Sequence, residues 1–208
     1  MLSNFDNIDM PRINEHLRAL VRADLQRERF PKFERTIEIN DGLVGSKKLK
    51  NIETLMCFLA SQKSRLVRDF ARAIPNLYGV GPKDFVNEAW AVQHWIQHNI
   101  RYVFDDKEEF QLPSRTIIDW AEGHDGADCD CMTILYVSLM KKLGWRDVGV
   151  ALLDSRGDGV ISHAMAVIKL PKPVEPWGDK WIPIELTKKV DFGWVTPKRT
   201  KFVVMRCK

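Results

Sequence analysis

Two cysteines flank an aspartate at the start of an apolar helical pattern, in the stretch GADCDCMTILYVSLMKKLGW, residues 126–145. The Gly-Ala-Asp segment supplies flexible backbone and a capping aspartate, so the sequence predicts that Cys129 begins a helix. A thiol at a helix N-terminus faces unpaired N–H groups and the positive end of the helix dipole, which stabilise a thiolate. Because the thiolate is the nucleophilic form, Cys129 is a candidate nucleophile, and an inert buried cysteine is the alternative.

A nucleophilic cysteine needs a histidine base and a third group that orients the imidazole. His163 begins the strand-like run SHAMAVIKL after a turn, which places it at an edge of the predicted sheet. Glu185 interrupts the apolar strand WIPIELT, where a buried carboxylate is costly unless it is paired, and an imidazole is a suitable partner. The order of these residues therefore predicts a Cys-His-acid triad.

A metal site is the rival interpretation of HDGADCDC, with His124, Cys129, Cys131 and an aspartate as ligands. Structural zinc sites usually combine two separated ligand pairs, commonly spaced C-x2-4-C, whereas this chain has C-x-C and no second pair after it. A redox pair would more typically be C-x-x-C. Cys131 lies about 200 degrees around the helix from Cys129, at ~3.6 residues per turn, and is expected to be a packed neighbour. We therefore expect no metal and no cofactor.

Helical patterns precede strand patterns along the chain, an order that predicts an α+β fold. Helical periodicity covers residues 10–29, 51–74 and 84–103, and a shorter helix follows the loop after FQLP. The run FERTIEIN alternates like a strand before an NDG turn, and three further strand patterns follow the cysteine helix: DVGVALLD, SHAMAVIKL and KWIPIELT. Gly144 stands where a helix C-cap glycine belongs.

The Pro/Gly-rich connector PNLYGVGP is a plausible internal boundary. It divides the chain into an N-terminal helical and hairpin accessory segment, residues 1–80, and a catalytic-type domain, residues 81–208.

Composition favours a soluble cytoplasmic protein. The 208 residues carry a net charge of +4, no apolar stretch approaches the roughly 20 residues that cross a bilayer, and the N-terminus is too polar for a secretory signal. Acidic residues are mixed with the basic ones, so we expect no specific nucleic-acid site. Four cysteines do not predict a disulfide framework in such a chain; Cys57 is expected to be a buried hydrophobe, and Cys207 to be incidental.

The ordered set GADCDCMTILYVSLMKKLGW, SHAMAVIKL and WIPIELT resembles the core of the transglutaminase-like (papain-like) superfamily. The upstream segment AWAVQHWIQHNIRYVFDDKEEFQLPSRTIIDWAEG is similar to that of transglutaminase-like proteins encoded by tailed bacteriophages. The resemblance covers roughly residues 85–190. It implies that Cys129 is the nucleophile, His163 the base and Glu185 the orienting acid. It also implies that the Gln111 amide, with the Cys129 backbone N–H, donates to the oxyanion.

The family's second aspartate after the cysteine is replaced by Cys131, and its strand aspartate by Glu185. Glutamate is one methylene longer, so the backbone must retreat to fit it.

The resemblance implies a cysteine hydrolase (a protease or amidase) or an acyltransferase, acting on peptide or carboxamide bonds of a protein or peptide substrate. Hydrolysis is favoured because no second site for an amine can be located. The alternative is a bacteriophage virion or assembly protein that keeps the fold with little or no catalysis and binds other phage structural proteins. We expect a location in the host cytoplasm, or in the virion, and no membrane partner.

Overall fold

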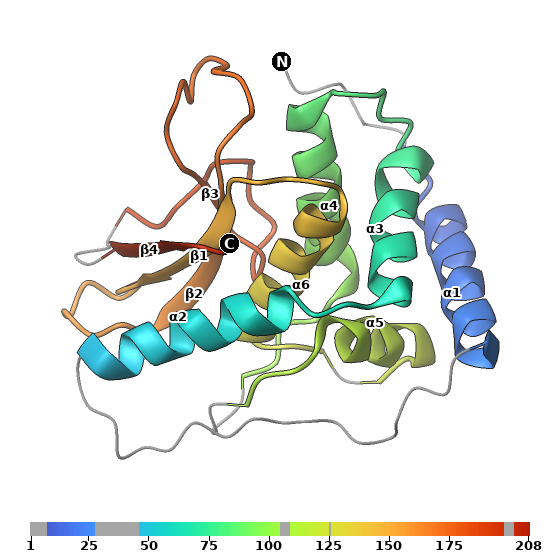
Figure 1. Ribbon diagram of the computed structural model, residues 1–208, viewed down its shortest axis with the longest axis horizontal. Helices are drawn as coiled ribbons and strands as arrows, with labels where there is room; N and C mark the ends of the chain where they lie inside the picture. Colours follow the sequence, from blue (N-terminus) through green and yellow to red (C-terminus); the bar gives the residue numbers. More distant parts are fainter. Residues whose placement is uncertain (1–7, 28–45, 105–108, 125, 198–201) are drawn as a thin grey trace.

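A computed structural model describes residues 8–27, 46–104, 109–124, 126–197 and 202–208. In these ranges the chain forms six helices and one four-stranded antiparallel sheet, which confirms the α+β class (Figure 1). The helices are α1 (Met10–Arg27), α2 (Ser46–Ala60), α3 (Arg65–Leu77), α4 (Phe85–Asn99), α5 (Pro113–Glu122) and α6 (Cys129–Lys142). The strands are β1 (Val148–Leu153), β2 (His163–Ile168), β3 (Ile182–Ile184) and β4 (Phe202–Arg206). The strand and turn predicted in FERTIEIN and NDG lie outside the described residues.

The single helix predicted over residues 51–74 is wrong, because two helices occupy this part of the chain. α2 ends at Ala60, and Ser64 caps α3 by accepting a hydrogen bond from the Val67 backbone N–H at 3.2 Å. Serine is a preferred N-cap residue because its hydroxyl satisfies an N–H that has no partner inside the helix. α3 then continues through Pro75, beyond the predicted end.

The sheet has the strand order β3-β2-β1-β4, and every neighbouring pair is antiparallel. β2 lies between β1 and β3, so His163 begins an interior strand, and the prediction that it stands at a sheet edge is wrong. β4 was not predicted; it pairs with β1 along the outer side of the sheet. Gly149 permits this pairing, because a Cβ at that position would lie 2.2 Å from the Met205 carbonyl oxygen.

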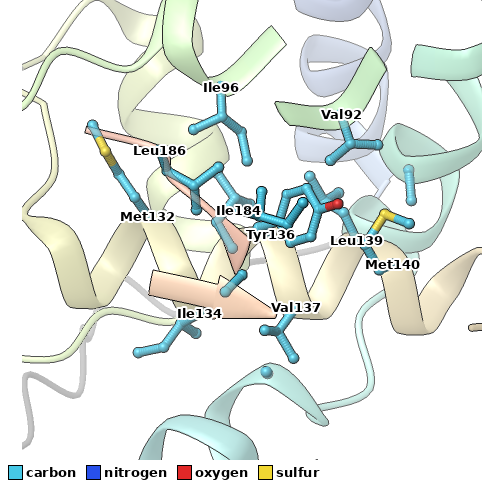
Figure 2. Packing of buried hydrophobic residues seen from close by; sticks show 14 of the residues in the cluster. Val92, Ile96, Met132, Ile134, Tyr136, Val137, Leu139, Met140, Ile184 and Leu186 are labelled. Carbon is cyan, nitrogen blue, oxygen red and sulfur yellow. The ribbon is translucent and has the colours of Figure 1, made fainter. Parts of the chain in front are cut away.

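Helix α6 lies between the sheet and the other helices, which makes it the centre of the core (Figure 1). All of its residues from Cys131 to Met140 are buried, so the helix has no exposed face along this stretch. Figure 2 shows Tyr136 beside Val92 of α4, while Val137 points to the opposite side of α6. The Tyr136 hydroxyl donates to the Ala89 carbonyl at 3.3 Å, which satisfies a buried polar group.

Gly144 follows the helix with a φ of +96°, a left-handed conformation that suits glycine and agrees with its predicted capping position. The residue therefore ends α6 as its sequence position indicated.

A disulfide joins Cys57 and Cys207, which are 150 residues apart in sequence. The expectations that Cys57 is a plain apolar residue and that Cys207 is incidental are therefore wrong. The bond connects α2 to the residue that follows β4, and Lys141 of α6 donates to the Cys207 carbonyl at 3.3 Å. The pairing of Cys57 with Cys207 depends on tertiary structure, since no local sequence pattern relates residues at this separation.

Within the described ranges, no helix combines the length and the apolar character that crossing a membrane requires.

Candidate active site

The backbone just before α6 determines where Cys129 lies. The Ala127 N–H donates to the Arg101 carbonyl at 2.9 Å, and the Val103 N–H donates to the Ala127 carbonyl at 3.1 Å. These bonds bring Gly126 so close to Arg101 that an added Cβ would lie 1.6 Å from the Arg101 oxygen. Only glycine permits this approach, so the sequence Gly-Ala-Asp holds the first turn of α6 against the segment that follows α4.

Asp128 caps α6, as its position in the sequence predicted. Its carboxylate accepts a hydrogen bond from the Cys131 backbone N–H at 2.8 Å, and Cys129 is the first helical residue. The Cys129 backbone N–H belongs to the first turn of a helix, whose N–H groups have no partner inside the helix. It is therefore a suitable donor to negative charge that develops beside the thiol.

The pKa of the Cys129 thiol is raised, whereas its place at a helix N-terminus predicted a lowered pKa. Burial, followed by the negative charge of Asp130, raises the pKa of the thiol above its ordinary value, and Asp128 adds to this shift. A hydrogen bond from the Ala164 backbone N–H acts in the opposite direction but does not reverse the result. The thiol lies 3.6 Å from an Asp130 carboxylate oxygen, to which it donates. The expectation of a low pKa, based on the helix N-terminus alone, is wrong because it neglects burial and the two flanking carboxylates.

His163 and Glu185 form a direct pair. The imidazole Nε2 lies 2.9 Å from a carboxylate oxygen of Glu185, and the two side chains are only 13% and 4% exposed. An ionised carboxylate can only accept, so Nε2 carries the proton and Nδ1 of the neutral ring is left as the acceptor. This tautomer is the one in which His163 can remove a proton through Nδ1.

Glu185 is held in its ionised form by several donors. Its other carboxylate oxygen accepts from the Leu186 N–H at 3.0 Å, and from the N–H and hydroxyl of Thr187 at 2.9 and 2.7 Å. Burial opposes ionisation, but the hydrogen bond and charge of His163, together with the Thr187 donors, outweigh it and lower the pKa of Glu185 to about 2. Glu185 directly follows Ile184, the last residue of β3.

Two glutamines of α4 hold the backbone of Glu185, and the sequence analysis missed both. Gln97 donates to the Glu185 carbonyl at 2.8 Å, and Gln93 donates to the same oxygen at 3.2 Å. Both amides also reach the Val190 carbonyl, at 3.3 and 3.4 Å. Glutamines four residues apart on a mostly buried helix were the available signal, because a buried amide needs partners.

Gln111 contacts the first turn of α6 through Cys131. Its backbone N–H donates to the Cys131 sulfur at 3.3 Å, and its side-chain oxygen accepts from the Thr116 hydroxyl at 3.3 Å. The side-chain NH2 group is left as a donor. Cys131 itself is 4% exposed, as expected for a packed neighbour.

The structure thus brings together some of the predicted site residues and not others. His163 contacts Glu185 directly, and the thiol of Cys129 is close to β2 at Ala164, the residue after His163. Among the described residues, the only side-chain hydrogen bond of the Cys129 thiol is to Asp130, so no such bond joins it to the His163 ring.

The rival metal interpretation required His124 to lie with Cys129 and Cys131, and it does not. It lies with Asp119 and Glu122, and the possible ligand atoms of these three residues are within 4.8 Å of one another. In the described part of the chain this is the only such group of three or more residues, and it contains no sulfur ligand.

No protein-family model, curated protein or solved structure matches this chain. The chemistry of the site must therefore be inferred from its residues: a thiol at a helix start, an imidazole on β2 paired with a carboxylate just after β3, and an amide donor near the same helix turn.

Proposed function

We propose that this protein is a cysteine hydrolase or acyltransferase with a transglutaminase-like, papain-like core, which acts on a peptide or carboxamide carbonyl. The observation that carries the proposal is the His163–Glu185 pair at 2.9 Å, buried beside the helix that begins at Cys129. A buried pair of this kind fixes the ring tautomer, which is the role of the third member of a triad. The resemblance of the sequence to phage-encoded transglutaminase-like proteins supports the same chemistry.

In the proposed reaction, the Cys129 sulfur attacks the carbonyl carbon while its proton passes to Nδ1 of His163. The raised pKa of the thiol means that the free protein holds it protonated, so His163 acts as a general base during attack rather than in a preformed ion pair. The thiol must first leave the Asp130 carboxylate to reach Nδ1, because its only side-chain hydrogen bond among the described residues is to Asp130. Catalytic hydrogen bonds often tighten only when substrate binds.

The tetrahedral intermediate carries a negative oxygen that needs donors. The Cys129 backbone N–H and the side-chain NH2 of Gln111 are the proposed donors, and the Thr116 hydroxyl orients the Gln111 amide by holding its oxygen. Collapse of the intermediate breaks the carbon–nitrogen bond, and the leaving amine takes the proton from His163. Water then attacks the thioester and releases the acid, or an amine does so in a transferase.

An activated ester tests this chemistry without knowledge of the physiological substrate. We expect p-nitrophenyl acetate to release close to one equivalent of p-nitrophenolate in a burst, with an acetyl group found on Cys129 by peptide mass spectrometry. Cys129→Ala should abolish the burst, and His163→Ala should slow it at least tenfold. Buried Cys131 is the internal control and should stay unmodified. A burst that persists in Cys129→Ala, or an equal rate in His163→Ala, would refute the proposal.

A second candidate is a virion or assembly protein that keeps this fold without catalysis. The observation in its favour is the thiol itself, whose pKa is raised and whose hydrogen bond goes to Asp130 rather than to the imidazole. In that case wild-type protein should show neither a burst nor an acetyl group on Cys129.

A further inference from the structure

A pocket of about 320 Å³ lies near the proposed active site and is not formed by the triad. Its walls come from α1, from the end of α4 and the segment after it, and from α5 with the residues up to Gly126. Gln111 lines it, whereas Cys129, His163 and Glu185 do not. The pocket therefore adjoins the proposed oxyanion donor without containing the nucleophile.

The described part of the pocket lining carries more positive than negative charge. Arg18 and Arg101 contribute guanidinium groups. Asp119 is the only carboxylate among the described lining residues, and Arg115 binds both of its oxygens, at 2.6 and 3.0 Å. The single described acid is thus already paired, so the guanidinium of Arg18 favours an anionic ligand.

Arg18 is placed to bind such a ligand. Its guanidinium lies over the Trp120 ring, 5.0 Å from the ring centre, and it forms no hydrogen bond or ion pair with the described residues. The neighbouring Leu17 is fully buried, which anchors this part of α1. A guanidinium that rests on an aromatic face can still present its N–H groups to a planar carboxylate in a bidentate arrangement.

The geometry points to a carboxylate-binding site. The volume suits a group the size of one amino acid, at the lower end of the range for ligand pockets. A doubly charged phosphate fits less well, because a carboxylate oxygen of Glu122 lies 3.5 Å from Nδ1 of the lining His124. Resting on the proposed function, the pocket takes the acidic side chain of a substrate residue beside the bond that is cleaved or transferred.

A divalent cation is the competing occupant, because Asp119, Glu122 and His124 could supply ligands. However, Arg115 occupies both oxygens of Asp119, and a metal there would be repelled by that guanidinium. The positive charge of Arg18 in the same pocket also opposes it.

Calorimetric titration with the α-methylamides of N-acetylglutamate and N-acetylglutamine, called by these two names below, tests the site. With the α-carboxylate blocked, the two probes differ only in the side-chain carboxylate or amide. The Cys129→Ala protein is used, so that binding is measured without chemistry at the thiol. We expect N-acetylglutamate to bind at least tenfold more tightly than N-acetylglutamine and to weaken as salt is added. Arg18→Met should reduce its affinity about tenfold, whereas Arg22→Met, an exposed residue of the same helix, should leave it unchanged.

Several outcomes would overturn the carboxylate site: equal binding of the two probes, no binding of either, or an unchanged affinity in Arg18→Met. Arg18→Lys, which keeps the charge but not the planar fork, should retain part of the affinity and checks that the helix is intact. The carboxylate site would also be refuted if inorganic phosphate bound more tightly than N-acetylglutamate. The same holds if N-acetylglutamate did not bind and Zn²⁺ bound in a way that His124→Gln abolished. If N-acetylglutamate binds but p-nitrophenyl acetate gives no burst in wild-type protein, the pocket stands and the proposed function fails.

Discussion

The His163–Glu185 pair predicts a specific dependence of stability on pH. The pKa of Glu185 is lowered from its ordinary value of 4.5 to about 2 in the folded protein. The unfolded chain therefore takes up a proton first as the pH falls. The stabilisation is fully present above about pH 4.5 and is lost as the pH falls toward 2. The difference amounts to about 3 kcal/mol in total, of which about 2 kcal/mol is lost by about pH 3.

Glu185→Gln removes the titrating carboxylate and keeps the size of the side chain. Urea unfolding followed by tryptophan fluorescence at about pH 7, 4.5 and 3 would measure the free energy of unfolding for both proteins. Between about pH 4.5 and 3, wild-type protein should lose about 2 kcal/mol more than Glu185→Gln does. Glu15→Gln, which changes an exposed carboxylate on α1, should behave like wild type.

The same substitution should also impair the proposed chemistry. The amide NH2 that Glu185→Gln introduces would face Nε2 of His163, which would favour the tautomer with its proton on Nδ1 and remove the base. The acetylation burst should therefore slow at least tenfold. If Glu185→Gln shows the same loss of stability with falling pH as wild type, the carboxylate is not held ionised by His163, and the assignment of the ring tautomer fails with it.

Three further predictions concern the Gln97 contact, the disulfide and the close approach at Gly126. Gln97→Ala should slow acetylation of Cys129 several-fold, because the Glu185 carbonyl loses its 2.8 Å donor. Gln97→Glu, which also lacks the amide donor, should not restore the rate, and an unchanged rate in Gln97→Ala would mean that the contact has no positioning role. Reduction of the Cys57–Cys207 disulfide should lower the free energy of unfolding by as much as about 5 kcal/mol, because the disulfide closes a long loop. The stability of Cys207→Ser should not respond to reductant, and identical unfolding curves for reduced and oxidised wild-type protein would contradict the bond. Gly126→Ala should lower the melting temperature by about 10 °C, because the added Cβ meets the Arg101 carbonyl. Gly81→Ala, where a Cβ has open space, should change the melting temperature little. Similar melting temperatures for the two variants would show that the close approach is absent.

Features that depend on a few consecutive residues could be predicted from the sequence. The start of α6 at Cys129, the cap at Asp128 and the left-handed glycine at Gly144 agree with the structure. Each depends on backbone groups within one helical turn, and the residue types that satisfy such groups are few. The pairing of Glu185 with an imidazole also agrees with the sequence argument, because a carboxylate in an apolar strand needs a partner.

Tertiary structure alone decided the properties that join distant parts of the chain. The Cys57–Cys207 bond, the addition of β4 to β1, and the hold of Gln97 on Glu185 all join residues that lie far apart in the sequence. The pKa of Cys129 belongs to the same class, since its first cause is burial under elements from the rest of the chain. A helix start can be recognised from its neighbours, but desolvation and long-range pairing depend on how the whole chain packs, and no local pattern carries that information.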